Sequence, residues 1–157
     1  MGAERFAAMG LDELPGHYIR RLQQIAVGIF MEETGTFGLT PVQYSALSAV
    51  LRHPGMDQRT LAGMIGFDTS TIGGVIDRLE ARGLMQRNAS PQDRRVRLLT
   101  VTASGADMLQ QIDPAVLKTQ EIILRPLGDE DQRQFLRLLK TLVEANNEAS
   151  RAPSDTA

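Results

Sequence analysis

Two short amphipathic segments that meet at a glycine constrain the fold of this chain more than any other feature. The stretch QRTLAGMIGFDTSTIGGVIDRLEARG covers residues 58–83, with Gly66 between the two segments. Ala62 is small enough to let two helices approach, and the branched Ile72 and Val75 can lock the second helix onto the first. The pattern predicts two short helices packed across a tight turn.

Capping signals predict a further helix directly before this pair. In LTPVQ, Thr40 can cap a helix, Pro41 suits the first helical position, and Gln43 completes a capping box. We therefore expect a helix from Pro41 to about Arg52, ended by the turn-forming HPG.

The paired helices carry their own start and stop signals. Asp57 is expected to cap the first helix, and either Asp68 or Thr69 the second. Gly83 is expected to close the second helix in a left-handed conformation.

Beyond Gly83, two segments are expected to form short antiparallel strands. They are LMQRN at 84–88 and RVRLLTV at 95–101, separated by the turn-forming ASPQDR. The register stays open, because Leu98 and Leu99 are adjacent apolar residues that break the alternation. The predicted fold is mainly α with a small β-wing.

Longer amphipathic helices are expected on both sides of this region. The first follows Pro15, and the last begins at Asp129. Thr102 can cap another helix, which Pro114 should kink or restart near Asp113. We expect one unit over 1–157, since this length suits a single core-bearing domain, with a disordered tail at 151–157.

Charge is unevenly distributed along the chain. The net charge is −2, yet residues 78–97 hold six arginines and only two acidic residues. A nucleic-acid-binding face needs local positive charge rather than a basic total. The chain has no cysteine, which excludes disulfides and thiolate metal sites. It also has no apolar run long enough to cross a bilayer, so we expect a cytoplasmic protein with no membrane partner.

The paired helices have the helix-turn-helix arrangement, in which the second helix enters a DNA major groove. An ordinary antiparallel helix pair is the more common alternative. Three motifs in order, LTPVQYSAL, LAGMIGFDTSTIGGVIDRLEARGL and DRRVRLLTVTASG, resemble the MarR family of winged helix-turn-helix transcription regulators. The resemblance implies a winged DNA-binding lobe at 39–103 and dimerisation helices at 14–35 and 104–150.

The family resemblance also implies a homodimer that binds a pseudo-palindromic operator in double-stranded DNA. Apolar stripes on the terminal helices support a dimer independently, because one small lobe cannot cover them. A monomeric helical bundle is the alternative.

The second of the paired helices offers the first set of candidate DNA contacts. Thr69, Ser70 and Thr71 stand at its N-terminal end, where hydroxyl and backbone N–H groups can meet phosphates or base edges. Gly73 and Gly74 follow, at a cost to the helix of about 1 kcal/mol each relative to alanine. Close approach to DNA and an internal packing contact are equally good reasons for them.

Arginines supply the second set of candidate DNA contacts. Arg78 resembles the DNA-facing arginine of the family, with a surface ion pair as the alternative. Arg82 and Arg87 are candidate phosphate contacts, unless they are simply solvated. Arg94 and Arg95 fit insertion into a minor groove, while Asp93 is expected to pair with one of them and organise the wing.

An enzyme or a metal site is not expected. The only histidines are His17 and His53, there is no cysteine, and no glycine-rich phosphate loop is present. We therefore assign no catalytic residue, no metal and no cofactor.

A small effector is the last expectation. A subset of regulators that look like this has a similar PGxxxRR opening and binds aromatic acids; here the opening is PGHYIRRLQQ at 15–24. His17, Tyr18, Arg20 and Arg21, together with Tyr44, form the candidate set for an aromatic carboxylate, since guanidinium matches carboxylate. Alternatively, Tyr18 packs in the dimer and the arginines form ion pairs or contact DNA.

The resemblance therefore implies a repressor of aromatic-compound catabolism that a small aromatic acid releases from its operator. Two alternatives share the fold: a DNA-binding or architectural protein without an effector, and a protein-interaction module that does not bind DNA.

Overall fold

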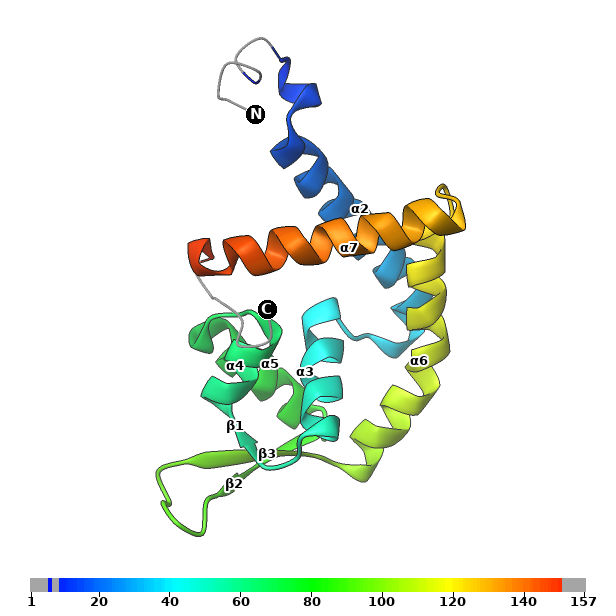
Figure 1. The fold of residues 1–157 in the computed structure, drawn as a ribbon. Coiled ribbons are helices and arrows are strands. Elements are labelled where there is room, and N and C mark those ends of the chain that lie inside the picture. The colour runs from blue at the N-terminus through cyan, green and yellow to red at the C-terminus, as the bar shows by residue number, and fades with distance from the viewer. Residues whose placement is uncertain (1–5, 7–8, 151–157) are drawn as a thin grey trace.

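The computed structural model of the protein describes Phe6 and residues 9–150 (Figure 1). Its α-helices are α2 (Pro15–Thr34), α3 (Pro41–Arg52), α4 (Gln58–Ile65), α5 (Thr69–Ala81), α6 (Ala103–Leu124) and α7 (Asp129–Asn146). Its short 3-10 helices are η1 (Leu11–Glu13), η2 (Gly35–Phe37) and η3 (Asn147–Ala149). The strands are β1 (Met56–Asp57), β2 (Met85–Ala89) and β3 (Arg97–Val101). The predicted disordered tail, 151–157, lies outside the described residues.

The predicted helix caps are confirmed. The hydroxyl of Thr40 accepts a hydrogen bond from the N–H of Gln43 at 3.3 Å, and the Gln43 side chain accepts one from the N–H of Thr40 at 3.0 Å. Asp57 caps α4, and Asp68 rather than Thr69 caps α5. Each carboxylate accepts the N–H of the residue three positions later, which fixes where the helix begins.

Helices α3, α4 and α5 enclose one apolar core beside the sheet. The turn between α4 and α5 needs the left-handed φ of 71° at Gly66, which glycine adopts without a steric cost. The fully buried side chains include Leu47, Leu61, Ile72, Ile76, Leu79 and Leu99. The predicted pair of packed helices is therefore present, with Ala62 buried between them.

The wing is a three-stranded antiparallel sheet with strand order β1-β3-β2. Met85 lies opposite Val101 and Ala89 opposite Arg97, which settles the register that the sequence left open. Only two strands were predicted. The third, β1, has two residues, too few to show an alternating pattern, and its second residue is also the cap of α4.

The first turn of α6 is pressed against the chain that follows α5. The hydroxyl of Thr102 donates to the carbonyl oxygen of Gly83 at 2.6 Å, and its N–H donates to that of Leu84 at 3.1 Å. A Cβ on Gly105 would lie 2.1 Å from the carbonyl oxygen of Leu84 and 2.7 Å from a methyl of Val101. Only glycine fits there, so α6 lies directly against the wing.

Helix α6 continues through Pro114, so the predicted restart near Asp113 is wrong. The predicted kink corresponds to a change in the direction of α6 in Figure 1. Proline at 114 removes the N–H that would bond to the carbonyl of Gln110. Both Gln110 and Pro114 are exposed, so water can solvate that carbonyl and the helix persists.

Helices α2 and α7 lie on the side of the molecule away from the wing, and α6 runs from the wing towards them (Figure 1). Helices α2 and α6 run side by side and are joined by an ion pair of 2.7 Å between Glu33 and Lys118. Helix α7 crosses near α2 and has no buried residue among those described. No helix in the described part of the chain is long and apolar enough to cross a membrane.

We expect Gly105→Ala to lower the free energy of unfolding by about 1–3 kcal/mol, because the added methyl overlaps the Leu84 carbonyl and a rigid backbone must move. Urea denaturation followed by circular dichroism measures this change. Gly35→Ala is the matched control, since Gly35 has helical dihedral angles and nothing within 4 Å of its Cβ position. Equal stability of the two variants would contradict the close contact.

Candidate nucleic-acid interface

Helix α5 presents its N-terminal end to solvent with one hydroxyl already engaged. Thr69, Ser70 and Thr71 are all exposed. The Thr71 hydroxyl donates to Asp68 at 2.6 Å, and the hydrogen bonds from Thr71 hold the pKa of Asp68 below its usual value. Among the described residues, the side chains of Thr69 and Ser70 have no such partner, so these two hydroxyls are available to an external group.

The two glycines of α5 have different surroundings. A Cβ on Gly73 would lie 3.0 Å from the Nε2 of Gln58, which in turn donates to the carbonyl of Thr69 at 2.9 Å. Gly73 therefore lets α4 and α5 pack together. A Cβ on Gly74 would meet only the Arg78 guanidinium, at 3.9 Å, so packing does not explain this glycine.

Arg78 lies one turn beyond Gly74 on the exposed side of α5. The structure does not support the predicted alternative of a surface ion pair, because no carboxylate among the described residues lies within 4.0 Å of its guanidinium. Ser70, Gly74 and Arg78 are spaced four residues apart and thus share one line along the helix. This line, which we call the outer line of α5, leaves its polar groups free.

The partners of Arg87 do not support the prediction that it contacts phosphate. Its guanidinium binds the carboxylates of Asp77 and Glu80 and donates to the carbonyl of Gly73 at 3.3 Å. The side chain is only 25% exposed, and its Nε has no partner among the described residues. Two carboxylates already balance this cation, so Arg87 fastens β2 to α5 and is poorly placed to neutralise a phosphate.

Arg82, also predicted to contact phosphate, bonds within the chain. It donates to the carbonyl oxygens of Phe37 and Gly38 at 2.9 and 2.7 Å. Both partners are more than 40 residues away in the sequence, so no local pattern could have indicated this role.

At the tip of the wing, Arg95 rather than Arg94 pairs with Asp93. The Asp93 carboxylate accepts the backbone N–H of Arg95 at 3.0 Å and its guanidinium at 3.2 and 3.3 Å. The backbone hydrogen bond, and then the guanidinium, lower the pKa of Asp93. Arg94 is exposed and has no carboxylate partner in the described part of the chain. Arg94 is therefore the free cation of the wing tip.

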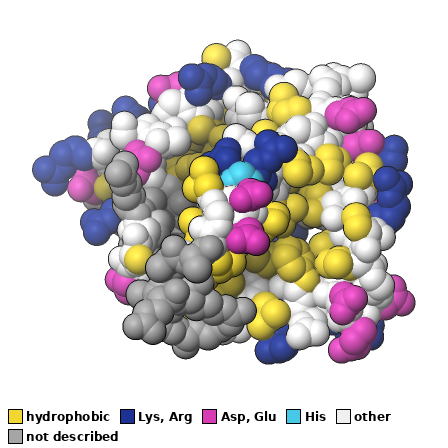
Figure 2. All heavy atoms as spheres, turned by 90° about the horizontal axis from the view of Figure 1, so that it is seen from above, with side chains coloured by type: hydrophobic (Ala, Val, Ile, Leu, Met, Phe, Trp, Pro, Cys, Tyr) yellow, Lys and Arg dark blue, Asp and Glu magenta, His cyan; other side chains and the backbone are white. Residues whose placement is uncertain are grey.

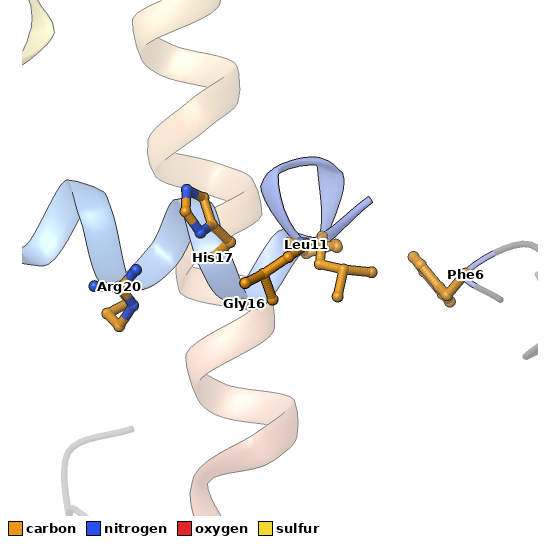
Figure 3. A pocket seen from close by; sticks show the side chains of 7 residues that line it. Phe6, Leu11, Gly16, His17 and Arg20 are labelled. Carbon is orange, nitrogen blue, oxygen red and sulfur yellow. The ribbon is translucent and has the colours of Figure 1, made fainter. Parts of the chain in front are cut away.

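The candidate effector residues do not form one site within the chain. His17 and Arg20 line an open hollow of about 570 Å³ together with Phe6, Leu11, Leu14, Pro15 and Gly16 (Figure 3). Arg20 and Arg21 donate to the Gln24 side chain at 3.3 and 3.1 Å rather than to a carboxylate. Tyr18 is 61% exposed, and its ring meets that of His17 edge-on.

Tyr44 lies in a second hollow, of about 360 Å³, formed by α3 and Met64 of α4. Its hydroxyl donates to Asp113 at 2.9 Å, and burial together with this bond raises its pKa. Arg52 and His53 line the same hollow, although neither was predicted to belong to the effector set. No cluster of three or more metal-binding side chains occurs among the described residues.

Paired helices α4 and α5, flanked by a three-stranded wing, define the winged helix-turn-helix class of DNA-binding domain. The model of the MarR family matches residues 39–96, and the chain belongs to that family.

Two named relatives are transcriptional regulators rather than enzymes. A putative transcriptional regulatory protein for the hcr operon of Thauera aromatica is 34% identical over 85% of this chain and 81% of its own. The transcriptional repressor NicR of Pseudomonas putida is 30% identical, over 88% of each chain.

Solved structures share the fold over most of the chain. PcaV of Streptomyces coelicolor, in complex with its natural ligand, has a TM-score of 0.82 and 34% identity, covering 88% of this chain and 97% of its own. The repressor CouR, bound to a 23-mer DNA duplex, has a TM-score of 0.80 and 30% identity, covering 85% and 94%. In BpsR of Bordetella bronchiseptica, DNA binding is regulated by 6-hydroxynicotinic acid. This structure has a TM-score of 0.81 and 27% identity, covering 85% of this chain and 96% of its own.

We expect the two glycines of α5 to respond differently to alanine. Gly74→Ala should raise the free energy of unfolding by up to about 1 kcal/mol, because alanine favours helix and its methyl meets only the end of the Arg78 side chain, at an ordinary contact distance. Gly73→Ala should gain less or lose stability, since its methyl displaces the Gln58 amide from the Thr69 carbonyl. Urea denaturation of both variants measures the difference. A larger gain for Gly73→Ala would contradict the assigned packing role.

Proposed function

We propose that the protein is a dimeric repressor that binds a pseudo-palindromic operator through α5 and the wing, and that a small aromatic acid releases it. The outer line of α5 is the observation that carries this proposal. Its free groups, Ser70 and Arg78, flank a glycine that no internal contact requires. A helix surface of this kind lets the backbone approach DNA closely, with few side chains to read bases.

Arg94 adds the second contact in this proposal. The ion pair between Asp93 and Arg95 shapes the wing tip, while the exposed Arg94 remains uncompensated. A narrow minor groove concentrates negative potential and attracts such a guanidinium. Thr69 would contact phosphate at the N-terminus of α5, whereas Asp68 already accepts both the N–H and the hydroxyl of Thr71. Arg95 would add charge beside Arg94.

The terminal helices support the dimer. Large apolar side chains on α2 and α7 are about half exposed in the single chain, namely Tyr18, Ile19, Ile25, Leu136, Leu138, Leu142 and Val143. Figure 2 shows hydrophobic side chains gathered over the face that carries these helices. A patch of this extent is costly in water unless a second surface covers it, and segments 14–35 and 104–150 supply a matching apolar surface from a second copy.

The effector part of the proposal rests on unpaired cations near aromatic rings. Arg20 and Arg21 have no carboxylate partner among the described residues, and His17 and Tyr18 lie beside them. These groups suit a ring that carries a carboxylate. Tyr44 would serve in the second hollow, beside the Arg52 cation. The similar structures include PcaV in complex with its natural ligand and BpsR, in which 6-hydroxynicotinic acid regulates DNA binding, and both favour an effector here.

Arg94→Ala should weaken operator binding about tenfold or more and reduce the salt dependence of binding, because a buried guanidinium contact with DNA is lost. Fluorescence anisotropy on duplexes from the region upstream of the gene, at several salt concentrations, measures both effects. Arg137→Ala is the control, since Arg137 is an exposed cation of α7. Unchanged affinity in an Arg94→Ala, Arg95→Ala double variant that stays folded would exclude the wing contact.

A panel of hydroxybenzoate, hydroxycinnamate and 6-hydroxynicotinic acid should contain at least one compound that raises the melting temperature and weakens operator binding. Binding to the native state stabilises it, so a thermal-shift assay detects the effector directly. Arg20→Ala should abolish that shift, whereas Arg137→Ala should not. If no member of the panel alters operator binding, the result favours a DNA-binding protein without an aromatic effector. If the protein binds no operator at all, the result favours a protein-interaction module.

A further inference from the structure

Arg82 connects the end of the recognition helix α5 to a distant part of the chain. It is the residue directly after α5, and its two terminal nitrogens donate to the carbonyls of Gly38 and Phe37 at 2.7 and 2.9 Å. A guanidinium presents donors in a rigid planar fork, so it can hold two neighbouring carbonyls at once. A lysine has a single ammonium group and cannot reproduce this pair of bonds in the same geometry.

The carbonyls that Arg82 holds belong to the junction between α2 and α3. Helix η2 follows α2 without a break, and Gly38 then turns the chain with φ of 64°. Leu39 is 1% exposed, and Thr40 caps α3. Because these residues form one short continuous path, a displacement at the end of α2 would act on the Arg82 guanidinium directly.

Helix α6 reaches the end of α5 from the other side. Its capping residue Thr102 bonds to the carbonyls of Gly83 and Leu84, and its Gly105 packs against the Leu84 carbonyl. The three residues 82–84 therefore receive contacts from the end of α2 and from the start of α6. These two long helices lie side by side, and α6 runs along the lobe from the wing (Figure 1).

We propose that Arg82 is a positioning residue that fixes the orientation of α5 relative to α2 and thereby the separation of the two recognition helices on an operator. This inference rests on the proposed function of dimeric operator binding. The Arg82 bonds to Phe37 and Gly38 supply the link, because they are side-chain bonds that one substitution removes without touching the backbone of either helix.

The test measures tolerance of operator spacing. A palindromic duplex is selected from a random pool with the wild-type protein, and versions with one base pair added or removed between the half-sites are prepared. We expect the wild type to bind these spacing variants about a hundredfold more weakly, since both recognition helices must be in register. Arg82→Met keeps the side-chain stem but has no hydrogen-bond donors. For this variant, the loss of affinity on a duplex with altered spacing, which we call the spacing penalty, should fall to about tenfold or less.

Arg82→Lys keeps the charge but not the fork, so its penalty should lie between those of the wild type and Arg82→Met. If Arg82→Met does not fold, Arg82→Lys is compared with the wild type in its place. Arg125→Met is the matched control, because Arg125 likewise follows a helix and is exposed, and it should keep the wild-type penalty.

Three results would overturn the inference. In the first, a change in half-site spacing weakens binding by both Arg82 variants as much as it weakens binding by the wild type, and any loss of affinity is equal on every duplex. Arg82 then contributes to stability alone. The same penalty with a salt dependence reduced by about one charge in Arg82→Met but not in Arg82→Lys assigns it to a phosphate contact. If the wild type selects no sequence with two half-sites, the proposed dimeric operator binding itself fails, and the inference falls with it.

Discussion

The contact between α6 and the Leu84 carbonyl determines where every other part of the DNA-facing surface lies. The N–H of Thr102 bonds to that oxygen at 3.1 Å, and no side chain fits at Gly105. A contact between two backbones cannot adjust in the way that two flexible side chains can. The C-terminal end of α5, the start of β2 and the start of α6 therefore behave as one rigid corner, from which the recognition helix and the wing both extend.

The arginines around this corner divide into two groups by what they bind. Arg82, Arg87 and Arg95 use their guanidinium groups inside the chain, on carbonyls or carboxylates. Arg78 and Arg94 have no such partner among the described residues. Part of the local excess of positive charge thus shapes the lobe, and the guanidinium groups of Arg78 and Arg94 have no carboxylate partner in the described part of the chain. Counting arginines in the sequence does not separate these two groups.

Local signals predicted the fold well. Thr40, Asp57, Asp68 and Thr102 cap the helices that they were expected to cap, because a cap depends on residues only three positions apart. Strand β1 was missed because two residues have no periodicity. The restart at Pro114 was wrong because the proline lies on an exposed face, which the sequence does not reveal.

The candidate site was harder to predict because its contacts join distant residues. Nothing near Arg82 or Arg87 in the sequence indicates their partners, whereas Asp93 and Arg95 are two residues apart and their pairing was half predicted. The two glycines of α5 look identical in the sequence, and only the neighbouring Gln58 distinguishes them. The effector set came from a resemblance, and the structure places Tyr44 in a different hollow from His17 and Arg20.

The lack of buried residues in α7 has a consequence for the life of the chain in a cell. Within a single copy, no side chain of this helix is buried, and a lone amphipathic helix of this length is marginal in water. Its amides should exchange early, and proteases should cleave it before they reach the lobe. If a second copy covers α7, a newly made chain must meet another copy before proteases cleave its α7. Faster synthesis raises the concentration of free chains, so the rate of synthesis determines how much intact regulator accumulates.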